Sequence, residues 1–280
     1  MPEYQNPNPS DLGLCEHGNF KNECLICGQK NREKTASDKK TKKLFGHGFE
    51  ITKIEEGDYI PVGGKSRFSD ETDIKIEGDF SSFENFYQKI DDLIEKYKSS
   101  NLSEWLLSNK VELDEKLIIP MIAFTKAYDK IYPENPLKEA ERANLYNTKH
   151  EKIKLSDVFS ANSAECAEIA VLAQGFLQRE GISSSYFGGD VLWDKEQEFS
   201  EEHSFVVIRQ GDKVYIYDPA NPTNTISGIF PSLYAIETDF DEEMARGQKR
   251  FVTAKNIFSK KEAYYGVNNG ISINPKKDII

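Results

Sequence analysis

The chain has 280 residues, of which 38% are hydrophobic, and a formal net charge of −11. This length is enough for one sizeable domain with a proper core, together with appended segments. So acidic a chain is repelled by phosphate backbones, which argues against nucleic acid as its main partner.

No apolar run approaches the roughly 18 residues that a membrane span needs, and the N-terminus lacks the apolar core of a signal peptide. No membrane span is therefore expected, and the cytoplasm or another reducing compartment is the expected location. Delivery into a host cell by a specialised secretion system would leave no mark in the sequence, so that route stays open.

Three of the four cysteines lie close together near the N-terminus, as Cys15-x-His17, six residues, and then Cys24-x-x-Cys27. Three thiolates and one imidazole complete a tetrahedral zinc site, and such a closed site is structural. A reduced or oxidised cysteine pair is the alternative, but the single thiol elsewhere in the chain favours zinc. Residues 1–28 are therefore predicted to form a zinc-knuckle-like segment that folds around Zn²⁺.

The next segment, residues 29–44, is basic. Its first fifteen residues, QKNREKTASDKKTKK, contain seven Lys or Arg against two acids. This composition predicts a flexible, solvated linker. A tail that binds nucleic acid or an acidic membrane is the alternative, which the lack of interleaved aromatic residues disfavours. The zinc segment is therefore expected to be tethered and available for docking onto another protein.

Residues 45–280 are predicted to form the folded domain. An amphipathic helix is expected at 81–97, where apolar residues recur three and four positions apart. Another is expected at 113–132, with a break or kink near Pro120, because proline cannot donate a helical hydrogen bond. The remaining elements expected before residue 150 are short strands at 50–54, 58–62 and 73–77 and helical pieces at 103–109 and 134–150.

The segment SANSAECAEIAVLAQGFLQREGI, residues 160–182, predicts a buried helix. Asn162 and Ser163 are suitable N-cap types, and Gly181 is suitable as the residue that follows the helix. Cys166 would lie in the first turn, where free N–H groups and the helix dipole favour a thiolate. Taken alone, this position favours a buried, inert cysteine over a reactive one.

The segment EEHSFVVIRQGDKVYIYDPANP, residues 201–222, predicts a β-hairpin. A two-residue turn at Gln210-Gly211 would place His203 directly opposite Asp218. Directly opposed residues share a face of the sheet and lie about 5 Å apart. A carboxylate in that place fixes the tautomer of a histidine and supports its charged form. A register slip of one residue would move the two side chains to opposite faces.

Cys166, His203 and Asp218 together form the set that cysteine chemistry needs: a nucleophile, its base and the partner that orients the base. The first donor for an oxyanion would be the backbone N–H of Cys166, and Asn162 is a weak candidate for the second. The sequence therefore predicts a catalytic triad.

The stretch from Ser160 to Asp218, which contains all three residues, resembles the transglutaminase-like branch of the papain-like cysteine enzymes. In that family a cysteine opens a core helix ending in Gly-Ile, a histidine starts a later strand, and an aspartate stands in Asp-Pro. Those positions are Cys166, Gly181-Ile182, His203 and Asp218-Pro219 in this chain. The sequence departs from the family pattern in having Ala164, rather than glycine, two residues before the cysteine, and in having no tryptophan after the histidine.

The resemblance implies an α+β, papain-like core, in which the nucleophile helix packs on an antiparallel β-sheet, at about residues 150–225. Further strands are expected at 185–193 and 251–254, and the rest of the C-terminal region reads as helical and polar pieces.

The resemblance also implies a thiol-dependent enzyme that hydrolyses, deamidates or transamidates an amide of a protein or peptide substrate, with no cofactor for catalysis. A catalytically inactive papain-like binding module, with the zinc segment as a second contact, is the main alternative. An acyl-CoA-dependent N-acetyltransferase is a third reading, but no feature of the sequence suits coenzyme A.

Overall fold

The computed structural model describes residues 42–45, 48–60, 75–100, 104, 106, 113–149, 153–225, 228–246, 250–267 and 279–280. The compact unit discussed below spans Lys43–Ile280. The predicted zinc ligands, Cys15, His17, Cys24 and Cys27, lie outside the described residues, as does most of the predicted linker. Within the described ranges, no group of three or more His, Cys, Asp or Glu side chains could hold a metal ion.

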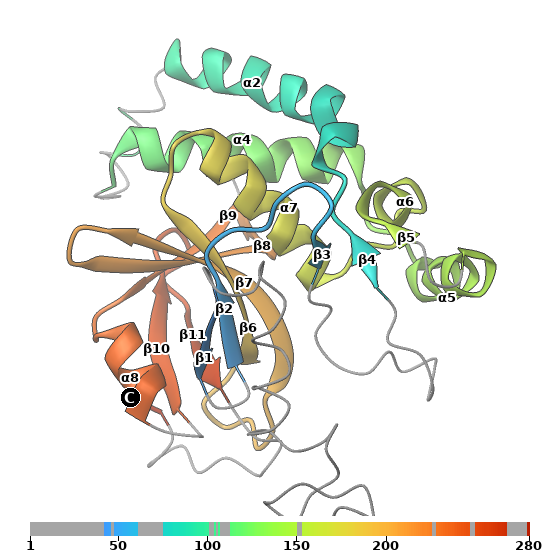
Figure 1. The fold of residues 1–280 in the computed structure, drawn as a ribbon. Coiled ribbons are helices and arrows are strands. Elements are labelled where there is room, and N and C mark those ends of the chain that lie inside the picture. Colours follow the sequence, from blue (N-terminus) through green and yellow to red (C-terminus); the bar gives the residue numbers. More distant parts are fainter. Residues whose placement is uncertain are drawn as a thin grey trace, which may run out of the picture. The chain divides into compact units, whose positions relative to one another are not determined.

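Six antiparallel strands close into a barrel (Figure 1). They follow one another around it in chain order, and the last pairs back with the first. The strands are β6 (Ser184–Leu192), β7 (Glu201–Gln210), β8 (Lys213–Thr225), β9 (Gly228–Ile236), β10 (Arg250–Asn256) and β11 (Glu262–Val267). One edge of β6 pairs with β7 along most of its length. The other edge is shared between β2 (Gly48–Ile51) and β11.

The closed barrel shows that the predicted papain-like fold, a helix packed on an antiparallel sheet, is wrong. The strands at 185–193 and 251–254 were expected and correspond to β6 and β10. The strands β9 and β11 were not expected, and they supply the pairings that complete the ring. Strand β9 contains Pro231, a residue that normally marks an edge strand or no strand at all.

Strand β8 is also longer than expected. The predicted hairpin ended at residue 222, but the strand runs through Asp218-Pro219 and continues to Thr225. Its pairing with β9 shifts register between Asp218 and Thr223. This irregularity accommodates two prolines that cannot donate to the ladder, as β-bulges do.

A layer of helices covers the outer face of one part of the barrel (Figure 1). Of these helices, α4 (Glu115–Ile131) and α7 (Cys166–Arg179) contact the barrel strands, and α2 (Glu84–Lys98) packs on α4. The 3₁₀ turn η2 (Phe80–Phe83), α6 (Leu155–Ser160) and α5 (Lys138–Lys149) follow beside them, each in contact with the next. Helix α7 lies directly on β6, β7 and β8. The helices expected at 81–97 and 113–132 are confirmed, but α4 runs through Pro120, which is buried, without ending there.

The apolar side chains divide between two main cores. The larger lies between the helices and the outward-facing residues of the strands, such as Tyr186 and Tyr217. The second core fills the barrel. Along each strand its residues alternate with residues of the first core, and on β7 Phe205 and Val207 belong to the second. Helix α8 (Phe240–Arg246) adds Phe240 to this interior core.

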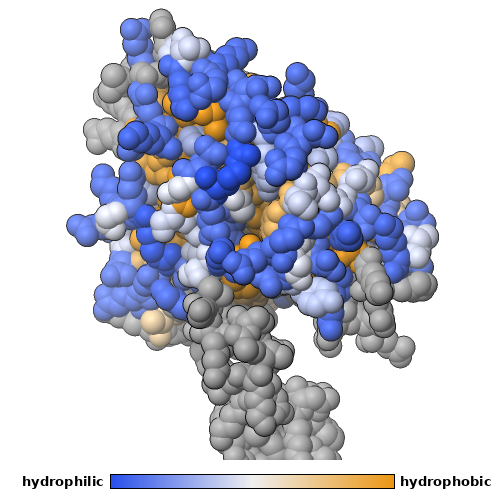
Figure 2. Space-filling model, turned by 45° about the horizontal axis from the view of Figure 1, so that its top comes forward, coloured by the Kyte–Doolittle hydropathy of each residue, from blue (hydrophilic) through white to orange (hydrophobic). Residues whose placement is uncertain are grey.

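The remaining strands are short. Strand β1 (Lys42–Phe45) continues the large sheet beyond β2, and β3 (Tyr59–Ile60), β4 (Ile76–Glu77) and β5 (Ile153–Lys154) form a separate small sheet. Hydrophilic side chains predominate on the face shown in Figure 2, with apolar residues visible between them. Among the described residues, no helix is both long and apolar enough to cross a membrane.

Candidate active site

Cys166 is the first residue of α7 and is partly buried. The helix ends as the sequence predicted, with Gly181 in the left-handed region at φ +76°. The N–H of Gly181 donates to the carbonyl of Gln178 at 3.0 Å, and the N–H of Ile182 donates to that of Leu177 at 2.9 Å. These two bonds form a Schellman cap. The N-cap is Glu165, so the expectation of Asn162 or Ser163 in that position is wrong.

A buried ion pair holds the segment that leads into α7. Arg142 of α5 donates from Nη2 to Glu168 Oε1 at 2.6 Å and from Nη1 to the carbonyl of Ser163 at 2.9 Å. The second oxygen of Glu168 accepts from the N–H of Glu165 at 2.9 Å. Both charged side chains are almost completely buried. The Arg142–Glu168 pair therefore fixes the turn immediately before Cys166.

Asn162 belongs to the same turn. Its backbone lies in the left-handed region at φ +48°, a conformation that asparagine tolerates better than most residues. Its side-chain Nδ2 donates to the carbonyl of Pro133 at 3.0 Å, and its own carbonyl accepts from Asn135 Nδ2 at 3.0 Å. These bonds tie the turn to the segment after α4.

The β7–β8 hairpin has a different register from the one predicted. The turn is Gly211-Asp212, with Gln210 opposite Lys213, so the pairing is shifted by two residues. Gly211 has φ +59°, as the first central residue of a type II′ turn requires. A shift of two keeps every side chain on its face, because the strand repeats every two residues. His203 and Asp218 therefore still point to the same side.

The side chains of His203 and Asp218 meet at the end of the barrel. His203 Nε2 lies 2.8 Å from Asp218 Oδ2, with 8% of the histidine and none of the aspartate exposed. The electrostatic interaction of Cys166 with His203 adds to the proton affinity of the imidazole.

His203 and Asp218 each stabilise the charged form of the other. Burial opposes protonation of His203, but the charge and hydrogen bond of Asp218, with those of Cys166, raise the pKa of His203 to about 10. Burial would raise the pKa of Asp218, yet His203, Asn221 and Tyr265 together hold it below its usual value. At neutral pH His203 is therefore an imidazolium paired with the carboxylate of Asp218.

Two residues around Asp218 were not anticipated from the sequence. Tyr265 of β11 donates from its hydroxyl to Asp218 Oδ2 at 3.0 Å. Asn221 Nδ2 donates to the same oxygen at 3.2 Å. A local signal existed for Asn221, because asparagine often bonds to residues a few positions away. None existed for Tyr265, which is 47 residues further along the chain.

Aromatic side chains form the surroundings of the imidazole. The ring of Trp193 meets that of His203 edge-on, with centroids 5.6 Å apart, and Trp193 is 36% exposed. Its Nε1 donates to Glu201 Oε2 at 3.0 Å. Across the β6–β7 ladder the partner of His203 is Gly189, which has no side chain. A tryptophan thus lies beside the histidine although none follows it in the sequence.

Replacing Tyr265 by phenylalanine is expected to lower the free energy of unfolding by about 1.5–3 kcal/mol, the usual contribution of a hydrogen bond to a charged group. The carboxylate of Asp218 is fully buried, and in the variant it would lose the hydrogen bond that the Tyr265 hydroxyl donates. Tyr264→Phe is the matched control, since its hydroxyl bonds at 3.3 Å to Glu262, whose carboxylate is exposed to water. Urea titration of both variants measures the difference, and equal losses would contradict a specific role for Tyr265.

Comparisons with known proteins supply no further guidance: the chain matches no family model, no curated protein and no solved structure.

Proposed function

We propose that the chain is a cysteine-nucleophile enzyme that transfers an acyl group from an amide of a protein or peptide substrate. The observation that carries the proposal is the buried contact of 2.8 Å between His203 Nε2 and Asp218 Oδ2, in a histidine whose pKa is raised by Asp218 and also by Cys166. A buried imidazole with a raised pKa, which is paired with a carboxylate and interacts electrostatically with a cysteine, is what thiolate catalysis needs. The proposal rests on these residues and on no particular fold.

In the proposed mechanism the Cys166 thiolate attacks the carbonyl carbon, forming a C–S bond and an oxyanion. The backbone N–H of Cys166 is available to that oxyanion, because the first N–H groups of a helix have no intrahelical partner. The proton on His203 passes to the leaving amine as the C–N bond breaks, which leaves a thioester and a neutral imidazole. His203 then removes a proton from water or an amine, which attacks the thioester and releases Cys166. Asp218 keeps the imidazole oriented throughout.

A generic acyl donor tests this proposal without knowledge of the substrate. With p-nitrophenyl acetate we expect a thioester on Cys166, visible as an acetyl group in the mass of its peptide, and a steady release of acetate. Cys166→Ala should lose both, while its fold stays intact, because the side chain is only shortened at the start of α7. Unchanged ester hydrolysis in Cys166→Ala, with no acetyl on Cys166 in the wild type, would contradict the proposal.

The same experiment separates the reaction types. Adding butylamine or hydroxylamine would divert the acetyl group into an amide or a hydroxamate if the site accepts amines. Persistent acetate formation would indicate water as the acceptor, as in a protease or deamidase. The catalytically inactive binding module would show neither product.

The zinc segment stays a prediction from the sequence. Purified protein is expected to contain about one zinc per chain, bound by Cys15, His17, Cys24 and Cys27. Cys24→Ser should lower the zinc content measured by atomic emission, whereas Cys166→Ser should not. Equal zinc content in both variants would contradict this ligand set. A reducing compartment is proposed for the protein, because both the zinc thiolates and a cysteine nucleophile require reduced sulfur.

A further inference from the structure

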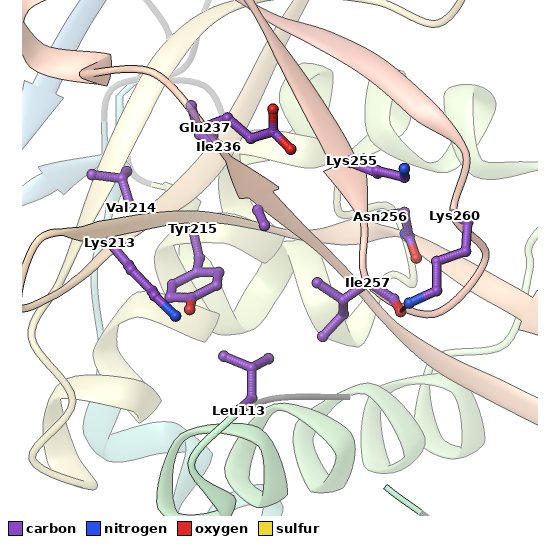
Figure 3. Close-up of a pocket in the computed structure, with 11 residues that line it drawn as sticks. Leu113, Lys213, Val214, Tyr215, Ile236, Glu237, Lys255, Asn256, Ile257 and Lys260 are labelled. Atoms are coloured by element: carbon purple, nitrogen blue, oxygen red, sulfur yellow. Dashed lines mark hydrogen bonds between the residues drawn. The ribbon is translucent and has the colours of Figure 1, made fainter. Parts of the chain in front are cut away.

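A cavity of about 470 Å³ lies outside the barrel, where the start of β8 meets the ends of β9 and β10 (Figure 3). Val214 pairs there with Ile236, and Lys255 pairs with Ala235. Leu113, just before α4, closes the cavity from the helical side. The cavity shares no lining residue with the Cys166–His203–Asp218 site, so it calls for its own explanation.

Three lysines on three different segments line this cavity. Lys213 begins β8, Lys255 belongs to β10, and Lys260 lies in the turn between β10 and β11. Glu237 is the single carboxylate among the lining residues. Within the described part of the chain, none of the three ammonium groups lies in an ion pair. The protein has a net charge of −11, whereas these three lysines, which lack ion-pair partners, make this cavity locally positive.

The walls between the lysines are apolar. Leu113, Tyr215 and Ile257 surround a common space, and Lys213 and Lys260 lie on opposite sides of it (Figure 3). Tyr215 is buried and Ile257 half-buried. An inorganic ion would leave these surfaces without contacts, so the complementary ligand carries a hydrophobic body as well as a negative charge.

The turn that carries Lys260 is held by several specific bonds. Asn256 is buried, and its Oδ1 accepts from the N–H groups of Phe258 at 3.0 Å and Ser259 at 2.9 Å. Lys260 itself has φ +60°, an uncommon conformation for a residue other than glycine. Its Nζ donates to the carbonyl of Ile257 at 2.7 Å. Conformations of this kind persist where the surrounding structure imposes them, and they concentrate at binding sites.

We propose that this cavity binds a small organic anion, in which a carboxylate or phosphate is attached to an apolar, ring-sized body. The anion lies among Lys213, Lys255 and Lys260, and the apolar body lies against Leu113, Tyr215 and Ile257. The volume is within the range of small-molecule sites, which is about 300–1,000 Å³. This inference does not depend on the proposed acyl-transfer activity.

Calorimetric titration with defined probes tests the proposal. Phenyl phosphate and 3-phenylpropionate carry both features, inorganic phosphate carries only the charge, and benzyl alcohol carries only the ring. At least one of the two aromatic anions is expected to bind ten times more tightly than either single-feature probe. The better of the two identifies the anionic group. Equal binding of all four, or no saturable binding at millimolar concentration, would overturn the proposal.

The variant Lys213→Gln/Lys255→Gln is expected to weaken binding of the better aromatic anion at least tenfold. Lys116→Gln/Lys130→Gln is the matched control, because it removes the same charge from exposed positions on α4 outside the lining. This control should change the affinity less than twofold. Equal weakening in the two variants would mean a general charge effect and overturn the assignment. Cys166 alkylation, unchanged in both, would report that the fold is intact.

Discussion

Replacing His203 by glutamine is expected to slow the alkylation of Cys166 by iodoacetamide about tenfold or more at pH 6. An ordinary thiol with a pKa near 8.5 is only about 0.3% ionised at this pH. In the proposed site His203 supplies the positive charge that promotes reaction of a cysteine, because the pKa of His203 is raised to about 10. A thiolate of lower basicity is a weaker nucleophile, so the net difference in alkylation rate between wild type and variant is expected to be roughly one order of magnitude.

The shape of the pH profile is as informative as the rate. Protonated His203 persists below pH 10, so its contribution to the wild-type alkylation rate should be present throughout the range from pH 6 to pH 9. In His203→Gln the rate should rise about tenfold per pH unit until it levels off near the pKa of an ordinary thiol, about 8.5. Glutamine retains a donor for Asp218 but cannot carry the charge, so the comparison isolates protonation.

The unfolded chain in denaturant supplies the reference rate for an unperturbed thiol, and peptide mass spectrometry separates Cys166 from the other three cysteines. If wild type and His203→Gln both follow the unfolded reference, then Cys166 is not activated. The binding-module interpretation would then replace the enzymatic one.

Replacing Arg142 by methionine is expected to lower the free energy of unfolding by about 3–5 kcal/mol, because it leaves the buried carboxylate of Glu168 without its counter-charge. The change should also reduce the reactivity of Cys166, since the turn before α7 loses the bond from Arg142 to Ser163. The double variant Arg142→Met/Glu168→Met should recover much of the stability, because no charge is then left buried and unpaired.

Arg179→Met is the matched control for this prediction. Arg179 also pairs with carboxylates, those of Asp91 and Glu180, but its partners and its own side chain are partly exposed. Its replacement should cost less than about 1 kcal/mol of electrostatic stabilisation. Denaturant titration of the variants measures all these values. A loss below 1 kcal/mol in Arg142→Met would show that the pair does not hold the turn.

Local patterns in the sequence predicted the local structure well. The amphipathic stretch at 81–97, the helix that begins at Cys166 and the cap at Gly181 each depend on neighbours within about five positions. The hairpin was found, but its turn was misplaced by one residue. The rule that a type II′ turn has glycine first would have selected Gly211-Asp212.

The parts that the sequence did not predict depend on distant segments. The barrel closes through pairing of β6 with β11, whose residues are separated by more than 70 positions, and no local pattern encodes that contact. Arg142 and Tyr265 reach the site from other elements for the same reason. The site residues could be named from the chain order of Cys, His and Asp, whereas their supporting residues could not.

The closure of the barrel also orders the steps by which the site is assembled. His203 and Asp218 lie 15 residues apart and meet in a hairpin that can form by itself, while Cys166 is 37 residues from His203. Tyr265 arrives only with β11, at a greater entropic cost of loop closure. The carboxylate therefore loses its last water contacts when the final strand docks. A chain that is only partly folded would hold the three residues of the triad without the dry environment that couples the charges of His203 and Asp218.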